Sequence, residues 1–267
     1  MRTFIINLAR RPDRKQYIHD QLVNTALHYE FIDAVDAQSP DFDALRRDNQ
    51  LTAQGPWGTM SHGTLACTLS HFKVLQRIAE GEDRFAAVLE DDVAISPSFA
   101  EFVKDEDWIP EHAQIVRLEH WNDPKQVIVM DRDALTVGRF ALKRLRSRTA
   151  GSAGYIISRQ FANHVLRHKH WFTMPIDHVL FNIGQSKLTR DACVYQLLPS
   201  VVIQDARWGT NISAAPPAKS VFNQLRRGGY EIASAARPLL RVLRQQASIS
   251  KTYFDPEFNS RDSGPTP

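Results

Sequence analysis

Short apolar runs alternate with stretches of helical periodicity from residue 4 to residue 203. The apolar runs predict buried strands, which we place at residues 4–8, 29–32, 85–89, 115–118, 140–142, 155–157 and 201–203. Apolar spacings of three and four predict helices, which we place at residues 13–25, 63–78, 158–166 and 176–183, with a short one from Ser39. Because strands alternate with helices, we expect an α/β fold with a Rossmann-type, mixed but mostly parallel sheet flanked by helices.

The pattern changes along the chain and predicts three parts. Residues 1–213 hold the alternation and are predicted to form one domain. Residues 214–251 are rich in Arg with interspersed apolar residues and predict a basic, amphipathic, helical C-terminal extension. Glycines and Pro238 would divide it into short helices. Residues 252–267 end in a polar stretch with two prolines and are predicted to be a disordered tail.

Composition narrows the class of protein. Hydrophobic residues make up 43% of the 267 and charged residues 24%, as in ordinary globular proteins. No apolar run approaches the ~20 residues of a membrane span, and the first residues lack the long apolar region of a secretory signal. Cys67 and Cys193 are too few for a disulfide framework or a zinc site on their own. Together these features predict a cytoplasmic protein.

Positive charge is concentrated near the C-terminus. Residues 219–251 carry seven Lys and Arg side chains and one Glu, a net charge of +6, whereas the whole chain has +3. Interleaved basic and apolar residues favour contact with an anionic membrane surface. Packing on the domain or an oligomer contact is the alternative. Nucleic acid is disfavoured as a partner, because the charge is confined to this segment and no nucleic-acid motif accompanies it.

Three consecutive carboxylates, Glu90, Asp91 and Asp92, directly follow the apolar run at residues 85–89. Ligands in open α/β sheets bind at the carboxyl ends of strands. Like charges at such a place need a cation or hydrogen-bond donors to neutralise them, and hard divalent cations prefer oxygen ligands. The triplet therefore predicts a metal–diphosphate site in an enzyme with a phosphate-bearing substrate. A solvated acidic turn is the alternative.

A basic loop follows the first predicted strand. Asn7, Leu8, Arg11 and Arg14 lie between that strand and the first helix, where backbone amides and a helix N-terminus favour an anion. Arginines can contact phosphate in a bidentate manner. No glycine-rich fingerprint is present, so a dinucleotide-binding loop is not indicated. The loop is either a phosphate-binding element or a solvated basic turn.

Two further polar pairs are candidates for the site. Ser70 and His71 lie on the predicted helix 63–78 and could contact a nucleotide or the acidic triplet, or simply pack. Asp177 and His178 open the predicted helix 176–183. Asp177 is either a favourable first-turn carboxylate or a catalytic base that meets a substrate hydroxyl. His178 could reach a metal ion.

Taken together, the sequence resembles glycosyltransferase family 25, the lipopolysaccharide-biosynthesis and collagen-galactosyltransferase group. The resemblance spans about residues 3–213 and consists of blocks in the family's order, at residues 4–14, 67–71, 88–93, 154–158 and 175–181. It implies a GT-A-like fold, a nucleotide-sugar donor (most often UDP-galactose), inversion at the anomeric carbon, and a glycan or lipid-linked glycan acceptor. The protein would then work in surface glycan assembly, such as that of lipopolysaccharide, peripheral to the inner membrane.

The resemblance also implies roles for individual residues. Glu90-Asp91-Asp92 would be the family's version of the Asp-X-Asp motif, with Asp92 at a metal ion, Mn²⁺, and the other two nearer the ribose and base. Asp177 would be the general base that inverting transfer needs. The metal would neutralise charge on the departing diphosphate. Two arginines of the basic loop would assist at the diphosphate, namely Arg11 and Arg14.

The chain departs from the family at the entry of the central helix. Where the family has Gly-Glu and Gly-Cys, this sequence has Gly63-Thr64 and Ala66-Cys67, and the usual Trp after Ser-His is replaced near Leu75. The missing acidic residue leaves the donor sugar open. It also motivates a rival hypothesis, a catalytically silent nucleotide-sugar- or glycan-binding homologue acting as a scaffold. A nucleotidyltransferase-like or hydrolytic α/β enzyme is a further alternative.

Overall fold

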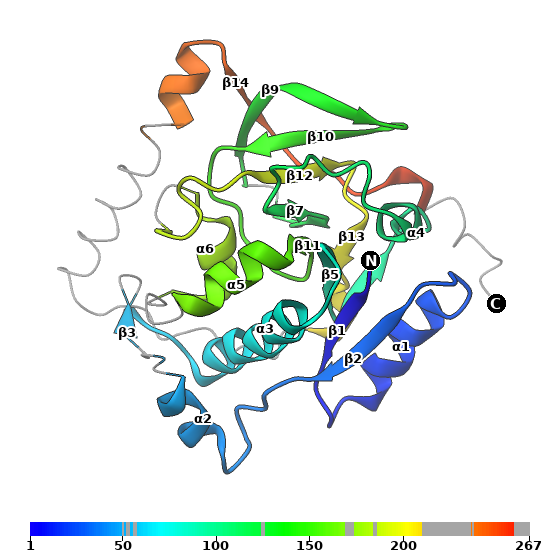
Figure 1. Cartoon of the computed structure of the whole chain (residues 1–267), viewed down its shortest axis with the longest axis vertical. Helices are drawn as coiled ribbons and strands as arrows, with labels where there is room; N and C mark the ends of the chain where they lie inside the picture. The colour runs from blue at the N-terminus through cyan, green and yellow to red at the C-terminus, as the bar shows by residue number, and fades with distance from the viewer. Residues whose placement is uncertain are drawn as a thin grey trace.

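A nine-stranded mixed sheet crosses the molecule (Figure 1), in the order β14-β9-β10-β12-β7-β11-β5-β1-β2. The computed structural model describes residues 1–49, 51, 54–55, 58–123, 126–168, 174–183, 186–209, 236 and 238–258. The strands of this sheet are β1 (Thr3–Asn7), β2 (Tyr29–Asp33), β5 (Phe85–Glu90), β7 (Ile115–Arg117), β9 (Ile128–Val137), β10 (Phe140–Leu145), β11 (Gly154–Ser158), β12 (Val194–Leu198) and β14 (Ala247–Ser250).

The sheet combines parallel and antiparallel pairing. Strands β2, β1 and β5 pair in parallel, as do β7 and β12. The five other neighbouring pairs of the described strands are antiparallel. The α/β class and the mixed sheet flanked by helices are thus confirmed, with more antiparallel pairing than the alternation predicted. The hairpin of β9 and β10, which needs no crossover helix, accounts for one of the antiparallel pairs. Strand β11 runs antiparallel to both β5 and β7 and accounts for two more.

Helices cover both faces of the sheet. One face packs on α3 (His62–Glu80), α5 (Arg159–Arg167) and α6 (Ile176–Phe181), and the other on α1 (Pro12–Leu22) and α4 (Phe99–Lys104). In β1, Phe4 and Ile6 face the α3 layer whereas Ile5 faces the α1 layer. This alternation explains why a central strand reads as a continuous apolar run, since both of its faces are buried.

Smaller elements complete the fold. A second sheet has the order β6-β13-β8 and lies beside the end of β5, because β6 starts directly after the acidic triplet. The remaining elements are α2 (Phe42–Asp48), β3 (Gln54–Gly55), β4 (Gly58–Thr59), β6 (Val93–Ile95), β8 (Glu119–His120), β13 (Val202–Gln204), η2 (Ala206–Trp208) and η3 (Pro256–Phe258). In the part of the chain that the structure describes, no helix is both long enough and apolar enough to cross a membrane.

The predictions for the helical extension and for the disordered tail are both partly wrong. Residues 247–250 form a strand that pairs with β9 at the edge of the large sheet, where a helix was predicted. Asp255 lies in the predicted disordered region but is 1% exposed, and it accepts a 2.6 Å hydrogen bond from Ser96 and pairs with Arg139 at 2.8 Å. Residues 252–258 are ordered because this buried carboxylate finds partners more than 100 residues away. The predicted boundary at 213/214 and most of the basic extension lie outside the described residues.

Candidate active site

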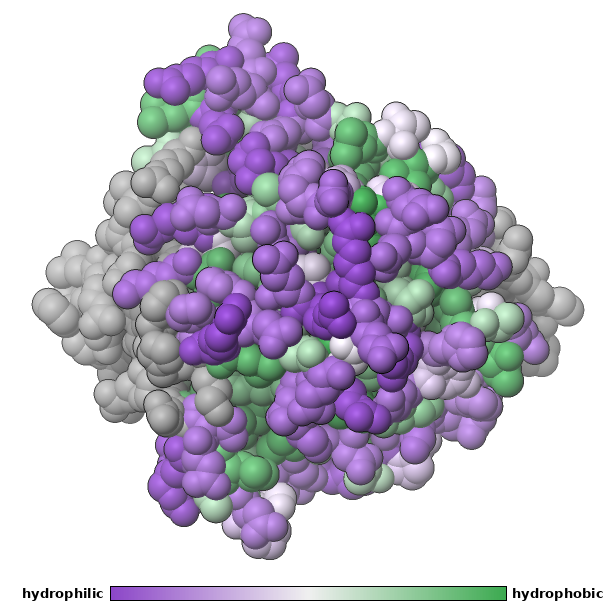
Figure 2. All heavy atoms as spheres, viewed as in Figure 1, coloured by the Kyte–Doolittle hydropathy of each residue, from purple (hydrophilic) through white to green (hydrophobic). Residues whose placement is uncertain are grey.

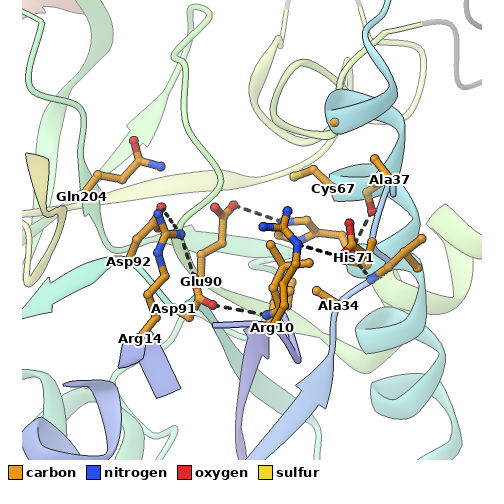
Figure 3. A pocket seen from close by; sticks show the side chains of 17 residues that line it. Arg10, Arg14, Ala34, Ala37, Cys67, His71, Glu90, Asp91, Asp92 and Gln204 are labelled. Carbon is orange, nitrogen blue, oxygen red and sulfur yellow. Dashed lines mark hydrogen bonds and ion pairs between the residues drawn. The ribbon is translucent and has the colours of Figure 1, made fainter. Parts of the chain in front are cut away.

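A pocket opens at the carboxyl ends of β1, β2 and β5, where the acidic triplet was predicted to lie (Figure 3). Apolar residues from the strand ends and from α3 line one side of it, namely Ile6, Leu8, Ala34, Val35, Ala37 and Ala66. Glu90, Asp91, Asp92 and Gln204 line the other side. An apolar wall opposite convergent carboxylates is the composition expected of a small-molecule site rather than of a solvated acidic turn.

Asp91 ties the basic loop to the triplet. One oxygen of this 5% exposed residue accepts hydrogen bonds from Asn7 Nδ2 (2.7 Å) and from the backbone N–H of Leu8 (3.3 Å). The other accepts from Arg14 (3.1 Å). Burial raises the pKa of Asp91, and the bonds from Arg14 and Asn7 oppose that rise. The structure thus brings Asn7, Leu8 and Arg14 into contact with Asp91, and the binding of a donor by these residues stays a prediction.

Arg14 is buried between the triplet and the segment that follows β13. Its guanidinium, 3% exposed, bridges the carboxylates of Asp91 and Asp92 at 3.1 and 3.0 Å. It also donates to the backbone carbonyls of Trp208 and Gly209. All these contacts hold Arg14 in the wall of the site. Its charge therefore offsets the repulsion within the triplet, and Arg14 supplies part of the neutralisation that the sequence required of a cation or of hydrogen-bond donors.

Arg11 lies at the rim of the same region. It pairs with Asp13 at 2.7 Å and its guanidinium lies 5.5 Å from the centre of the Trp208 ring. The Asp13 carboxylate raises the pKa of Arg11. Trp208 packs on Tyr17, Arg11 and Arg14.

Asp92 has one oxygen that the surrounding protein leaves unsatisfied. Its Oδ2 pairs with Arg14, whereas Oδ1 is buried and has no hydrogen-bond partner among the described residues. Burial and the neighbouring Glu90 raise the pKa of Asp92 to about 7, against the pull of Arg14. Leaving a buried acceptor without a donor lowers the stability of the fold. A divalent cation can fill this place, because it binds carboxylate oxygens. The residues present therefore fit the metal that the sequence resemblance implies.

Glu90 belongs to a separate network on the α3 side of the pocket. Its Oε1 accepts from Ser152 Oγ at 3.1 Å and lies 3.3 Å from His71 Nε2. His71 Nδ1 in turn lies 2.9 Å from the hydroxyl of Tyr155. Burial alone would raise the pKa of Glu90, but the hydrogen bonds from His71 and Ser152 hold it below its usual value. Glu90 is therefore an anion inside the pocket, as the sequence predicted.

Ser70 has a supporting position. Its hydroxyl accepts from the backbone N–H of Val35 at 2.8 Å and donates to the carbonyl of Ala66 at 2.8 Å. These bonds fasten the loop after β2 to α3 and so shape the apolar wall. Ser70 lines the pocket as predicted, with both of its hydrogen bonds made to the backbone of that wall.

Asp177 and His178 stand apart from the pocket lining. Asp177 accepts from the backbone N–H of Gly151 (3.3 Å) and of His178 (2.8 Å). Neither residue is among those that line the pocket with Asp92. The loop at residues 150–153 connects the two places, because Gly151 contacts Asp177 and Ser152 contacts Glu90. The base role of Asp177 and the metal role of His178 stay predictions, and the structure does not bring His178 together with Asp92.

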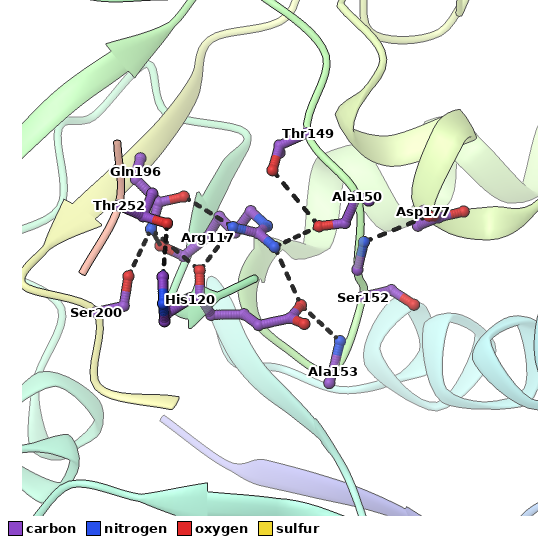
Figure 4. A network of polar contacts seen from close by, with 12 residues as sticks. Arg117, His120, Thr149, Ala150, Ser152, Ala153, Asp177, Gln196, Ser200 and Thr252 are labelled. Atoms are coloured by element: carbon purple, nitrogen blue, oxygen red, sulfur yellow. Dashed lines mark hydrogen bonds and ion pairs between the residues drawn. The ribbon is translucent and has the colours of Figure 1, made fainter. Parts of the chain in front are cut away.

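A buried polar clamp under this loop escaped the sequence interpretation (Figure 4). Arg117 and Glu119 are both 0% exposed. Arg117 donates to the carbonyls of Glu119 and Ala150 and to Gln196 Oε1, and Glu119 accepts from the backbone N–H of Ala153 at 3.0 Å. Burial raises the pKa of Glu119 to about 8, although Arg117 opposes the rise. The sequence does contain a sign of this clamp, because two charged residues alternate with apolar ones at the end of a predicted strand.

The clamp also fixes a backbone conformation. Gly151 has a φ of +88°, and a Cβ there would lie 2.3 Å from Glu119 Oε1. Such a φ suits glycine, and the close approach of the carboxylate leaves no room for a side chain. The loop that carries the contacts to Glu90 and Asp177 is therefore held from below by Arg117 and Glu119.

Replacing Arg117 with Met is expected to lower the free energy of unfolding by at least about 3 kcal/mol, because several buried acceptors lose their donor at once. Urea denaturation at pH 7 measures this loss in the free energy of unfolding. Arg132→Met is the matched control, since Arg132 is exposed. A loss below about 1 kcal/mol, as for an ordinary surface substitution, would show that the clamp does not stabilise the loop.

The fold and the pocket together define an α/β protein with a carboxylate-lined pocket at its strand ends. The sequence profile of "Glycosyltransferase family 25 (LPS biosynthesis protein)" matches residues 1–180. The chain therefore belongs to glycosyltransferase family 25 and is a glycosyltransferase. The predicted family and the predicted enzyme class are confirmed.

Similar proteins include two bacterial ones whose names refer to glycan biosynthesis. The "Lipooligosaccharide biosynthesis protein lic2B" of Haemophilus influenzae is 23% identical over 76% of this chain and 76% of its own. The "Lacto-N-neotetraose biosynthesis glycosyltransferase LgtE" of Neisseria gonorrhoeae is 26% identical over 80% of this chain and 77% of its own. A solved glycosyltransferase "involved in the glycosylation of the major capsid of PBCV-1" is 8% identical, with a TM-score of 0.38 over 86% of this chain and 98% of its own.

Proposed function

We propose that the enzyme transfers galactose from UDP-galactose, with inversion, to a hydroxyl of a glycan or lipid-linked glycan in lipopolysaccharide or other surface glycan biosynthesis. Membership of the family supports a nucleotide-sugar donor and a glycan acceptor. The names of the relatives support the pathway. The observation that carries the proposal is the buried, unsatisfied Oδ1 of Asp92, a residue that lines the pocket.

The pocket residues suit the parts of such a donor. Asp92 Oδ1 would hold Mn²⁺, which would neutralise the charge that develops on the diphosphate. The apolar wall around Val35 suits the face of a base, and the Glu90 carboxylate suits ribose hydroxyls as a hydrogen-bond acceptor. Asp177 would accept the proton of the acceptor hydroxyl. That hydroxyl would have to approach from the α6 side, beside the loop at residues 150–153.

A panel of nucleotide sugars tests the donor. We expect UDP-galactose with Mn²⁺ to raise the melting temperature, because a ligand that binds only the folded state stabilises it, and to yield UDP when a glycan acceptor is added. Other nucleotide sugars serve as matched controls. Binding without UDP release would favour the silent scaffold homologue. Release of pyrophosphate or of free galactose would favour a nucleotidyltransferase-like or hydrolytic enzyme.

We further propose that the enzyme works in the cytoplasm at the surface of the inner membrane. Residues 238–243 are helical, with Leu239, Leu240 and Leu243 exposed. Arg241 and Arg244 accompany them, and Figure 2 shows hydrophobic and hydrophilic atoms side by side over this part of the molecule. Exposed apolar side chains next to arginines match an anionic lipid surface, where each arginine contributes about 1 kcal/mol.

Vesicle sedimentation tests the membrane contact. The full chain is expected to sediment with vesicles that contain phosphatidylglycerol and to remain in solution with pure phosphatidylcholine. Replacing Leu243 with Asp should reduce the bound fraction several-fold, because Leu243 is 79% exposed and the change adds negative charge. Leu135→Asp on β9, also exposed, is the control. Equal binding of the two variants would contradict this contact.

A further inference from the structure

Three side chains that can each bind a metal ion meet on the α3 side of the pocket. Cys67 and His71 lie one helical turn apart on α3, and Glu90 ends β5. One ligand atom from each, the thiol sulfur, a ring nitrogen and a carboxylate oxygen, lies within 4.8 Å of the other two. His71 Nε2 and Glu90 Oε1 are 3.3 Å apart. Figure 3 shows all three side chains at the pocket.

Neighbouring side chains already hold the ligands in orientation. The buried hydroxyl of Tyr155 lies 2.9 Å from His71 Nδ1, and the two rings stack. When a cation binds, the ring proton would lie on Nδ1 and be donated to this hydroxyl, and Nε2 would give its lone pair to the cation in place of its contact with Glu90. Histidines that bind metals are oriented in this way by a partner on the other ring nitrogen. Ser152 Oγ, 3.1 Å from Glu90 Oε1, similarly fixes the carboxylate.

The chemistry of these ligands differs from that at Asp92. A thiolate, an imidazole and a carboxylate are ligands of Zn²⁺, whereas a hard cation such as Mn²⁺ or Mg²⁺ prefers oxygen. Three protein ligands leave a fourth tetrahedral position for water or substrate. Bond lengths of ~2.0–2.3 Å place tetrahedral ligand atoms about 3.5 Å apart. The ligand atoms have to approach one another by up to about 1.3 Å, which rotations of the Cys67 and Glu90 side chains can provide.

We propose that Cys67, His71 and Glu90 form a binding site for a thiophilic divalent cation of the Zn²⁺ type, and that the bound cation excludes the nucleotide sugar from the pocket. The exclusion follows from the position of the site, because all three residues line the same pocket as Asp92. A cation there also takes over the Glu90 carboxylate. This second half of the proposal rests on the proposed donor, whereas the binding of the cation does not.

Cobalt spectroscopy tests the site on the full, metal-free chain. Co²⁺ takes the place of Zn²⁺, and a thiolate ligand produces a sulfur-to-cobalt charge-transfer band in the near ultraviolet. We expect this band with one equivalent of Co²⁺, and we expect Zn²⁺ to remove it. Cys67→Ser should abolish it, and Cys193→Ser is the matched control because Cys193 lies outside the pocket. No band in the parent chain, or a band that survives Cys67→Ser, overturns the site.

A competition measurement tests the exclusion separately. Stoichiometric Zn²⁺ is expected to weaken UDP-galactose binding at least about tenfold in the parent chain and not in Cys67→Ser. A chelator selective for Zn²⁺, added with Mn²⁺ in excess, should restore binding. A cobalt band without any loss of UDP-galactose binding overturns the exclusion. Failure of the chain to bind any nucleotide sugar in the absence of Zn²⁺ overturns the proposed donor instead, and the cobalt result then still decides the metal site.

Discussion

Replacing Asp92 with Asn is expected to reduce Mn²⁺-dependent sugar transfer at least about a thousandfold, which corresponds to about 4 kcal/mol of transition-state stabilisation. The reason is the Oδ1 atom, which is buried and has no donor from the described protein. An amide oxygen there carries no charge to hold the cation. Asp20→Asn on α1, an exposed residue outside the pocket, is the control. Full transfer by Asp92→Asn would show that the metal is held elsewhere.

The same substitution should change how stability depends on pH. The pKa of Asp92 is raised from an ordinary 3.8 to about 7, so from about pH 4 to pH 7 the folded chain binds more protons than the unfolded chain. The free energy of unfolding therefore falls as pH rises through this window and stays reduced above it. Asp92→Asn removes the ionising carboxyl and with it this decrease in the free energy of unfolding. Without divalent cations, we expect the variant to be about 1–3 kcal/mol more stable than the parent at pH 8.

Urea denaturation at pH 5 and pH 8 measures this difference. The gain should be smaller at pH 5, where the Asp92 carboxyl of the folded parent is already protonated. For the same reason Mn²⁺ should bind the parent more weakly at pH 5 than at pH 8, because the cation needs the ionised carboxylate. A variant that is less stable than the parent at pH 8 would show that the pairing with Arg14 outweighs the repulsion within the triplet.

Replacing Asp177 with Asn is expected to lower kcat about 10²- to 10⁴-fold, the usual contribution of a general base. UDP-galactose binding should stay within about twofold. An asparagine still offers one oxygen to a backbone N–H, such as that of Gly151, so the geometry of the loop should survive. Asp191→Asn, an exposed residue, is the control.

The alternative outcome is equally informative. Asp177 contacts the loop whose Ser152 reaches Glu90. A residue that only positions this loop would affect donor binding as much as turnover when it is replaced. Equal losses in donor binding and in kcat would therefore contradict the base role and make Asp177 a positioning residue.

Local patterns were enough to predict much of the architecture. They also predicted that the acidic triplet and the loop after the first strand lie at the same edge of the sheet. The run at residues 85–89 has the length and apolar character of a strand that is buried on both faces, and the charges that follow it lie at its carboxyl end. Parallel strands end at the same edge of a sheet, so the loop with Asn7 and Leu8 came to the same place as Asp91. These relations follow from periodicity and from the rules of strand order.

Pairing choices of individual charged side chains could not be predicted in this way. Arg14 had solvent, a phosphate and several carboxylates as possible partners, and only packing buried it against Asp91 and Asp92. The pattern of residues 214–251 predicted a basic, helical extension, yet residues 247–250 pair with β9 because an open strand edge was there to accept them.

The sequence by itself determined the α/β class, the family and the presence of acid at a strand end, since each depends on residues that are close together in the chain. Only the tertiary structure decided which oxygen of Asp92 lacks a donor, that Arg117 and Glu119 clamp the loop below Gly151, and that Cys67 shares a pocket with Glu90. Each of these depends on contacts across many residues of sequence, and on burial, which determines how strongly a charge needs a partner.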